Sequence, residues 1–476
     1  MRLKNEPVKI ETGAAFAGDG FKNRQEAGNT LTEFVKSANE PIVICIDAPW
    51  GQGKTTFLRM WEQDLKDKKI PVLYFNAWEN DFSDNALTTL IGEISNSIKK
   101  LTNNGNSDKA CQYWNEVKKY GAQMLKKALP AALKLTTAGL LDFDAATEQT
   151  LSNLTEAIAK EQIDHYEKAK ITLSSFKEAL TNFAKIISDK DRAPLIFIID
   201  ELDRCRPNFS IEVLEKVKHF FSVKNIVFIL GADKTQLGHA IRSIYGQGLD
   251  VDGYLRRFID FSYTLPPPQR GDFVKVLFQR FGFNEYFTKK THSHTKNEEQ
   301  QSLQLFASLF HVYDLTLREQ EHCCSILSIA IKMTPHSVRL FPLPLCFLIV
   351  LKIKEPDLYK NFINGKASHH DLMNNVRGKD FENTLAKSHE LLLLEAYLAT
   401  CRCNRNFDSI VAGYRVQAKE FEQHKNEETK KVNVDRIDWV IRTIQRMEYR
   451  DEESVSLQTL LKKLELFTNF GMLGNL

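Results

Sequence analysis

Residues 48–55, with the sequence Ala-Pro-Trp-Gly-Gln-Gly-Lys-Thr, have the residue types and the spacing that bind phosphate groups. In such a loop the backbone N–H groups point inward and donate hydrogen bonds to phosphate oxygens. The Lys54 ammonium would place a positive charge over the β- and γ-phosphates of a nucleoside triphosphate, and the Thr55 hydroxyl would bind Mg²⁺. The nucleotide-binding residues that we predict here are Trp50, Gly51, Gln52, Gly53, Lys54, Thr55 and Thr56.

One position departs from the usual form of this loop, because Ala48 stands where a glycine is common. Alanine tolerates most backbone conformations but not the left-handed one. We therefore expect a right-handed conformation at Ala48, with Gly51 and Gly53 shaping the loop. The alternative, a chance match in a surface turn, is disfavoured by the apolar run 42–46 before the loop and the helical pattern from Thr56 after it.

Two carboxylates follow an unbroken apolar run at residues 194–199. Such a run is typical of a central parallel strand that is buried on both faces. Asp200 at its tip is predicted to hold Mg²⁺, mostly through water. Glu201 is predicted to act as the general base that polarises the water attacking the γ-phosphate. The alternative is a solvated strand end, which a phosphate loop upstream disfavours.

Polar residues also follow two other predicted strands. Asp233 comes after the run 226–232, at a strand tip where a polar side chain commonly senses the γ-phosphate. Glu79 and Asp81 lie in the loop after the run 70–75, and either could approach the Mg²⁺ ion or the attacking water.

Several arginines are candidates for contact with phosphate. Arg204 and Arg206 could touch a phosphate or pair with Asp203. Arg256 or Arg257, just before the last predicted strand, stands where ring-forming ATPases place an arginine finger, which stabilises charge on the phosphoryl group held by the next subunit. A structural salt bridge is the competing interpretation for this pair.

Two further arginines lie in the helical region that follows. Arg318 is in the first turn of a helix with a predicted capping box, Thr316 with Glu319, and could fold back over the nucleotide as a lid sensor. Arg339 is a second candidate for this role. For each of them, a surface arginine is the competing interpretation.

Hydrophobic periodicity predicts the elements that position these groups. Strands are predicted at residues 42–46, 70–75, 194–199, 226–232 and 260–265. Helices alternate with them, so we predict an α/β fold with a parallel sheet, whose ligand sites lie at the carboxyl ends of the strands. An amphipathic helix at 24–37 precedes the first strand and packs either beside the nucleotide base or only against the core.

The remaining sequence is predicted to be helical. From Leu151, apolar residues recur at intervals of three and four, which predicts a long helix paired with the helix before it. This hairpin is either self-packed or an arm that binds a partner. We divide the chain into a P-loop NTPase core (1–83 and 191–268), a helical insertion (84–190), a helical lid (269–345) and a C-terminal all-helical region (346–476).

The composition is that of a soluble globular protein, with 26% charged and 43% hydrophobic residues. The net charge of +3 argues neither for nor against nucleic-acid binding. The apolar stretch 341–353 is shorter than the ~20 residues of a membrane span, so we expect a buried helix and no membrane contact. The first residues lack the apolar core of a signal peptide, and the eight cysteines lack paired zinc-site spacing, so we expect a cytoplasmic protein with reduced thiols.

Several motifs together resemble the KAP family of P-loop NTPases. They occupy residues 50–55, 75–78, 199–205, 265–268 and 316–319. The family usually has two Asp where this chain has Asp200 and Glu201, so the general base is Glu201 or is shared with Asp203. Many members carry transmembrane helices in the insertion after the second strand, whereas this insertion is too polar. The resemblance implies an additional-strand ATPase core, a helical lid, ATP with Mg²⁺, and for similar bacterial members an association with exclusion of phage or foreign DNA.

The sequence therefore supports two functions. The first is a Mg²⁺-dependent ATP hydrolase that acts as a conformational switch, with Lys54, Glu201 and Arg256 or Arg257 as catalytic residues. The second is an ATP-gated assembly scaffold with little hydrolysis. Self-association and a protein partner bound through the helical regions are expected. A nucleic-acid motor receives little support from the charge.

Overall fold

The structure is a computed structural model that describes the whole chain except residues 1, 4–7, 18–21, 39, 84, 102–106, 128–147, 189–192, 222, 268–270, 290–297, 335–340, 381–384, 386–387, 401–406, 423–426 and 449–476. The chain forms two compact units. One comprises Lys9–Gly18 and Lys22–Pro267, and the other comprises Met1–Val8, Asp19–Phe21 and Pro268–Leu476. We describe each unit by itself.

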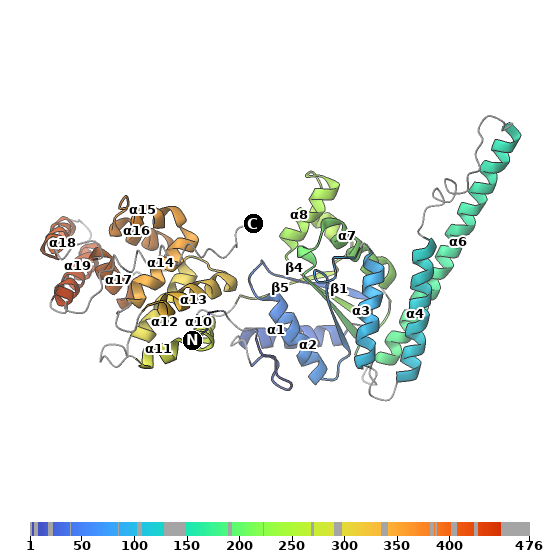
Figure 1. Cartoon of the computed structure of the whole chain (residues 1–476), viewed down its shortest axis with the longest axis horizontal. Coiled ribbons are helices and arrows are strands. Elements are labelled where there is room, and N and C mark those ends of the chain that lie inside the picture. The colour runs from blue at the N-terminus through green and yellow to red at the C-terminus, as the bar shows by residue number, and fades with distance from the viewer. Residues whose placement is uncertain are drawn as a thin grey trace. The chain divides into compact units, whose positions relative to one another are not determined.

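A five-stranded parallel sheet forms the centre of the first unit (Figure 1). Its strands are β1 (Ile42–Asp47), β2 (Val72–Asn76), β3 (Leu195–Asp200), β4 (Ile226–Ala232) and β5 (Phe261–Thr264). They lie in the order β2-β3-β4-β1-β5, so β4 is an additional strand between the strand that precedes the phosphate loop and the strand that ends in Asp200. The predicted parallel α/β fold is confirmed.

The register of the strands brings their carboxyl ends level. Asn76 on β2 is opposite Asp200 on β3, and Asp200 is opposite Gly231 on β4. On the other side of β4, Ala232 is opposite Asp47 of β1. Consequently the polar residues that follow these strands gather at one edge of the sheet.

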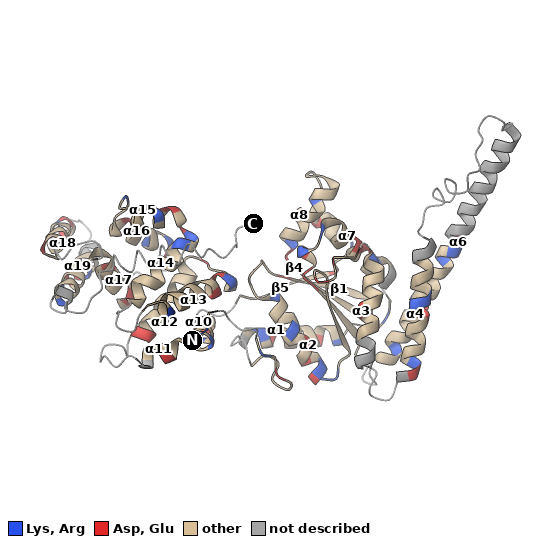
Figure 2. Ribbon diagram, viewed as in Figure 1, with Lys and Arg blue, Asp and Glu red and all other residues tan. Residues whose placement is uncertain are grey.

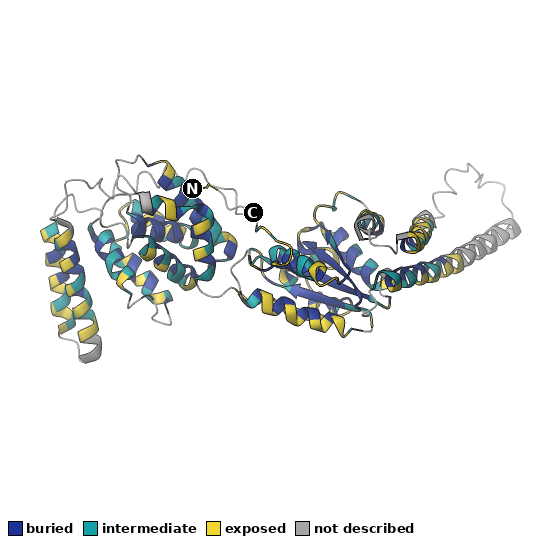
Figure 3. Ribbon diagram, turned by 90° about the horizontal axis from the view of Figure 1, so that it is seen from below, coloured by how far each residue is buried: buried dark blue, intermediate teal, exposed yellow. Residues whose placement is uncertain are grey.

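Both faces of the sheet are covered by helices, because its inner strands are apolar on both sides (Figures 1 and 3). On one face Cys45, Phe197 and Leu230 share a core with α3, α7 and α8. On the other face α2 contacts β2, β3 and β4, with α1 packed beside it. The helices of this unit are α1 (Lys22–Lys36), α2 (Lys54–Asp67), α3 (Ala86–Leu101), α4 (Ser107–Lys127), α6 (Glu148–Ile187), α7 (Pro207–Lys216), α8 (Lys234–Tyr245) and α9 (Val251–Leu255), with a 3₁₀ turn at Leu202–Arg204 and a π-helical turn at Val217–Phe221.

The long helix predicted from Leu151 is α6, which packs side by side with α4 (Figure 1). The Trp114 and Phe183 ring centroids are 5.1 Å apart, and Phe176 and Leu180 are buried in the same core. The predicted pairing with the preceding helix is therefore confirmed. In the described part of residues 84–190, every regular element is a helix.

Every regular element among the described residues of the second unit is a helix, with Leu277, Phe306 and Phe347 among the side chains of its main core. The apolar stretch predicted to be a buried helix is α14, whose first ten residues are all buried. The helices are α10 (Asp272–Phe281), α11 (Phe283–Lys289), α12 (Glu298–Val312), α13 (Leu317–Lys332), α14 (Pro342–Lys354), α15 (Pro356–Ile363), α16 (His369–Lys379), α17 (His389–Thr400), α18 (Phe407–Glu422) and α19 (Glu427–Glu448).

The predicted capping box of α13 is present. The Thr316 N–H donates to Glu319 Oε2 over 2.7 Å, and the Glu319 N–H donates to the Thr316 hydroxyl over 3.2 Å. Lys354 Nζ also lies 2.9 Å from Glu319 Oε1. Burial raises the pKa of Glu319, but the hydrogen bonds from Lys354 and Thr316 outweigh it and hold this pKa below its usual value.

Acidic and basic side chains are interspersed along the helices (Figure 2). At the end of the second unit, the buried Glu395 on α17 pairs with Arg377 of α16 at 2.6 Å and with Arg436 of α19 at 3.6 Å, and it accepts a hydrogen bond from Tyr414 of α18. This network joins four helices. Within the described ranges, none of the helices has the length and apolar character needed to cross a membrane.

Candidate active site

The phosphate loop runs from the end of β1 to the start of α2. Gly51 and Gly53 have φ values of 83° and 74°, in the left-handed region that glycine adopts at little cost. The φ of Ala48 is not positive, as expected, so the missing glycine places no strain on the loop. Gly53 is the N-cap of α2, whose N-terminus therefore faces the loop and favours an anion there.

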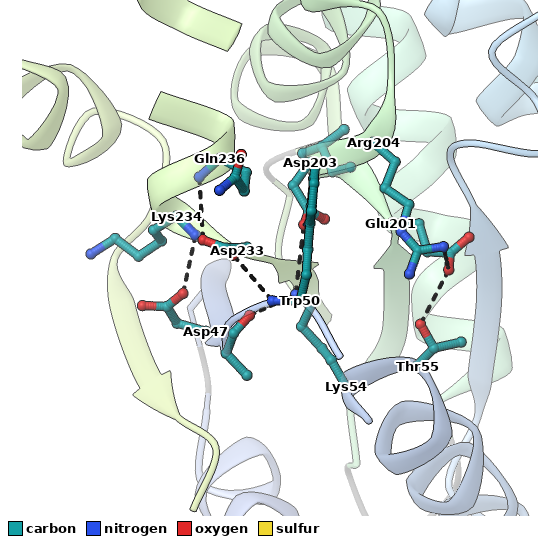
Figure 4. Close-up of polar contacts among 12 residues, drawn as sticks. Asp47, Trp50, Lys54, Thr55, Glu201, Asp203, Arg204, Asp233, Lys234 and Gln236 are labelled. Atoms are coloured by element: carbon teal, nitrogen blue, oxygen red, sulfur yellow. Dashed lines mark hydrogen bonds and ion pairs between the residues drawn. The ribbon is translucent and has the colours of Figure 1, made fainter. Parts of the chain in front are cut away.

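Lys54 lies in the first turn of α2 and is buried. Its Nζ donates to the Ala48 carbonyl over 2.9 Å and is 3.7 Å from Asp203 Oδ2. The ammonium thus closes the loop on itself and faces the residues that follow β3 (Figure 4).

Trp50 connects the loop by hydrogen bonds to the residues that follow β3 and β4. Its backbone N–H donates to Asp233 Oδ2 over 3.2 Å, and its indole Nε1–H donates to Asp203 Oδ2 (Figure 4). Asp233 is also the N-cap of α8, because its Oδ1 accepts from the backbone N–H groups of Thr235 and Gln236. The Asp233 carboxylate therefore has three N–H donors and holds the loop against β4, while its predicted role as a γ-phosphate sensor stays a prediction.

Asp200 is fully buried at the end of β3. Its Oδ2 accepts a hydrogen bond from the Tyr74 hydroxyl over 2.6 Å, and its Oδ1 accepts from the Glu201 N–H over 2.8 Å. Burial raises the pKa of Asp200, and hydrogen bonds from Tyr74, Thr55 and the Glu201 backbone oppose that rise. Gly231 on the neighbouring strand leaves room for this carboxylate, because a Cβ there would lie 2.5 Å from Asp200 Oδ1.

Glu201 has a φ of 60°, which is rare for a residue with a long side chain. Such a conformation costs ~1–3 kcal/mol and persists where surrounding contacts enforce it, often at functional sites. Here Oε1 is 2.7 Å from Arg204 Nη1 and 3.4 Å from the Thr55 hydroxyl, while Oε2 accepts from Asn76 Nδ2 over 3.1 Å. Glu201 therefore lies next to Thr55 of the phosphate loop helix (Figure 4).

The two arginines that follow β3 both pair with acids other than Asp203. The pair formed by Arg206 joins this loop to the loop after β2. Arg204 pairs with Glu201 rather than with Asp203. Arg206 pairs with Asp81, since its N–H and Nε donate to the Asp81 carboxylate over 2.6 and 3.0 Å. The Asp81 carboxylate is thus a structural partner of Arg206, which leaves it a poor candidate for binding Mg²⁺ or the attacking water.

The site is rich in acids. Asp200, Glu201, Asp203 and Asp233 are all buried at the edge of the sheet, beside the buried Lys54. Carboxylate and hydroxyl oxygens are the ligands that Mg²⁺ prefers. The Thr55 hydroxyl lies 3.4 Å from Glu201 Oε1 and near enough to Asp200 to lower the pKa of that carboxyl, so the donor set fits a magnesium ion between α2 and β3.

The structure does not bring all predicted arginines to this site. Arg256 and Arg257 are exposed after α9, and among the described residues neither forms an ion pair, so the salt-bridge interpretation has no support there. Arg318 is an exposed residue of the second unit, and its role as a sensor stays a prediction. Arg339 lies outside the described residues.

Sequence reasoning missed three side chains that contact the site. Tyr74 and Asn76 lie on β2 and hold Asp200 and Glu201. Arg24, on α1, donates to the carbonyls of Gly53 and Gln52 over 2.9 and 2.6 Å. A signal for Arg24 existed, because it falls three residues before Ala27, on the apolar stripe of its helix, where a charged residue needs a buried partner.

A model of the KAP family P-loop domain matches residues 24–344, which is more than half of the chain. No curated protein matches it. Among solved structures it is similar to the Aeropyrum pernix ORC2 protein in its ADPNP and ADP complexes, with 12% identity and a TM-score of 0.28 over 95% of this chain and 97% of that one.

Proposed function

This chain belongs to the KAP family of P-loop NTPases, and we propose that it is a Mg²⁺-dependent ATP hydrolase that acts as a conformational switch. One observation supports hydrolysis beyond mere binding of a nucleotide. The Thr55 hydroxyl, in the first turn of the phosphate loop helix, lies 3.4 Å from Glu201 Oε1 at the end of β3, and its proximity to Asp200 opposes the rise in the pKa of that carboxyl. The residues that bind phosphate and the residues that could activate water are therefore in contact.

ATP would bind with its β- and γ-phosphates on the loop and the N-terminus of α2. The backbone N–H groups of Gly51, Gly53 and Lys54 would donate to phosphate oxygens, as the positive φ of Gly51 and Gly53 supports. Lys54, already at the mouth of the loop, would exchange its contact with Ala48 for the phosphates. Thr56 would add contacts from the same helical turn.

Thr55 and Asp200 would hold Mg²⁺, the ion that neutralises charge developing on the phosphate oxygens. Glu201 would then act on water. Its carboxylate accepts a proton from the attacking water, whose oxygen bonds to the γ-phosphorus as the bond to the β,γ-bridging oxygen breaks. Asp203 is the less suitable base, because its Oδ2 is engaged by the Trp50 indole and lies close to Lys54.

Glu201→Gln tests this assignment. The variant keeps the shape of the side chain and the φ of the backbone but cannot accept the proton, so we expect ATP binding within about twofold of wild type and a loss of turnover of about 10²–10⁴-fold. Asp81→Asn, at a neighbouring acid that pairs with Arg206, is the matched control and should keep the turnover of the wild type. Undiminished phosphate release by Glu201→Gln would remove Glu201 from the mechanism.

A second candidate, an ATP-gated assembly scaffold, is favoured by two contacts of Glu201. Arg204 and Asn76 both hold the Glu201 carboxylate, so the base is engaged in this conformation. A scaffold would bind ATP and leave it intact. Single-turnover measurements separate the two functions, because absence of released phosphate over many minutes would favour the scaffold.

We further propose that the site is completed by a second copy of the chain. The exposure of Arg256 and Arg257 supports an arginine finger that acts on the neighbouring subunit. The mass of the purified protein should then increase with ATP, and turnover per molecule should rise with protein concentration. A monomer at full turnover would rule out action in trans.

The helical parts are proposed to transmit the state of the nucleotide. Hydrolysis would move the insertion (84–190) and the lid (269–345), which carries Arg318, and so change the binding of a protein partner in a cytoplasmic setting. The family resemblance supports a role in excluding phage. If the proposal is correct, Glu201→Gln expressed in the native host should lose protection against phage infection. Full protection by that variant would contradict a hydrolysis-driven switch.

A further inference from the structure

Arg24 of α1 is buried beneath the phosphate loop, with 1% of its surface exposed. Its Nη1 donates to the Gly53 carbonyl over 2.9 Å, and its Nη2 donates to the Gln52 carbonyl over 2.6 Å. A guanidinium is a planar, rigid fork of donors with a permanent charge. It therefore fixes two consecutive carbonyl groups of the loop in one orientation.

The planarity of the peptide bond carries this constraint to the other side of the loop. In a trans peptide group, the C=O of one residue points opposite to the N–H of the next. No described peptide bond is cis. The two carbonyls that Arg24 holds are thus rigidly linked to the N–H groups of Gly53 and Lys54, which must point away from the guanidinium.

These two N–H groups are among the donors that a phosphate loop directs at the bound phosphates. The loop alone does not fix the orientation of these N–H groups, because Gly51 and Gly53 have wide conformational freedom. The Gly53 carbonyl also accepts from the Phe57 N–H over 3.0 Å, within α2. Arg24 is therefore the contact that extends the order of the helix back to Gln52.

The positive charge of Arg24 acts on these peptide groups in addition to fixing their orientation. A cation at the carbonyl end of a peptide group polarises it and strengthens the N–H at the other end as a donor, since hydrogen bonds in series reinforce each other. The buried location of Arg24 reduces screening by solvent. Its charge therefore favours an anion on the far side of the same two peptide groups.

We propose that Arg24 is a positioning residue of the nucleotide site, which orients and polarises the Gly53 and Lys54 N–H groups toward the phosphates. The inference rests on the proposed binding of ATP to this loop. It differs from a purely structural role, in which Arg24 only joins α1 to α2. A structural role predicts a loss of stability alone, whereas a positioning role predicts a loss of affinity that depends on the phosphates.

The test uses Arg24→Lys in the full-length chain, with Arg24→Gln as a second variant. Lysine keeps the charge but cannot hold both carbonyls in a fixed fork, and glutamine loses the charge. The matched control is Thr32→Val, also on α1, which removes the hydrogen bond from Trp61 Nε1 to the buried Thr32 hydroxyl but does not touch the loop. Affinities for ATP and for adenosine are measured by competition against a fluorescent nucleotide, and unfolding is measured without nucleotide.

We expect Arg24→Lys to weaken ATP binding about 10–100-fold, the effect of losing a charge-assisted hydrogen bond, and Arg24→Gln to weaken it further. Adenosine affinity should be unchanged, and Thr32→Val should lose stability but bind ATP like the wild type. Equal weakening of ATP and adenosine, or ATP affinity within about twofold of wild type in Arg24→Lys, would overturn the positioning role. A wild-type chain that binds no ATP would instead overturn the proposed function, and the inference with it.

Discussion

Gly231→Ala would place a methyl group against the carboxylate predicted to hold Mg²⁺. A Cβ on Gly231 would lie 2.5 Å from Asp200 Oδ1 and 2.4 Å from Leu58 Cδ1, both far shorter than a van der Waals contact. Leu58 can turn its side chain in response. Asp200 cannot move without losing a hydrogen bond, because its two oxygens are held by the Glu201 N–H and by the Tyr74 hydroxyl.

Two costs follow from this geometry. An extra methyl in a well-packed core destabilises a protein by ~1–3 kcal/mol. Loss of one hydrogen bond to a charged group adds ~1.5–3 kcal/mol. We expect the free energy of unfolding to fall by roughly 2–4 kcal/mol in urea denaturation, since part of the strain relaxes through Leu58. Displacement of a positioned group by ~1 Å can cost ~100-fold in turnover, so phosphate release should fall by that order.

Two variants separate the effect on the site from the effect on packing. Gly231→Ala/Leu58→Val removes the clash with Leu58 but not the clash with Asp200, so it should regain some stability and no activity. Gly238→Ala, whose Cβ would lie 3.0 Å from Val251 Cγ1 on α9, is the control for overpacking away from the site. If a folded Gly231→Ala variant turned over ATP at the wild-type rate, the claim that turnover depends on the position of the Asp200 carboxylate would be refuted.

Two smaller perturbations test other contacts. Arg204→Ala removes the partly exposed ion pair with Glu201, so the free energy of unfolding should change by less than ~1 kcal/mol. Because the Glu201 carboxylate is then released, basal turnover should rise severalfold. An unchanged or lower rate would show that the ion pair does not restrain the base. Glu319 has a pKa held below its usual value in the folded chain, so its stabilising effect is present above about pH 4.5, the unfolded value, and is lost as the pH falls through the folded pKa. Glu319→Gln should therefore have a lower melting temperature than the wild type at pH 7, and this difference should become smaller as the pH falls. A difference in melting temperature that does not depend on pH would contradict this.

The sheet could be predicted from the sequence because each strand is a short apolar run with its own boundary signals. Residues 194–199 predicted β3 in this way, and the apolar stretch at 341–353 predicted the buried helix α14. Helix starts were less accurate. The helix predicted at residues 24–37 spans Lys22–Lys36, since apolar periodicity marks the buried face of a helix rather than its terminal residues.

The partners of the site residues could not be predicted in the same way. Asn76 and Glu201 are 125 positions apart in sequence and meet only because β2 and β3 are adjacent and in register. Arg204 could have paired with Asp203 by sequence proximity alone. The left-handed backbone at Glu201 directs its side chain instead toward Thr55 and Arg204, and nothing local in the sequence signals that conformation.

The contacts of Trp50 explain how it anchors the loop. A phosphate loop must keep its N–H groups free for the ligand, so it can be anchored only through its carbonyls, its side chains and its first residues. Arg24 uses the carbonyls on one side. Trp50 uses its backbone and indole N–H groups on the other, toward Asp233 and Asp203. Asp203 also faces Lys54, so a change in the position of Asp203 would reach the loop through two side chains. The Asp203–Trp50 contact therefore connects the acidic residues that follow β3 directly to the glycine-containing loop.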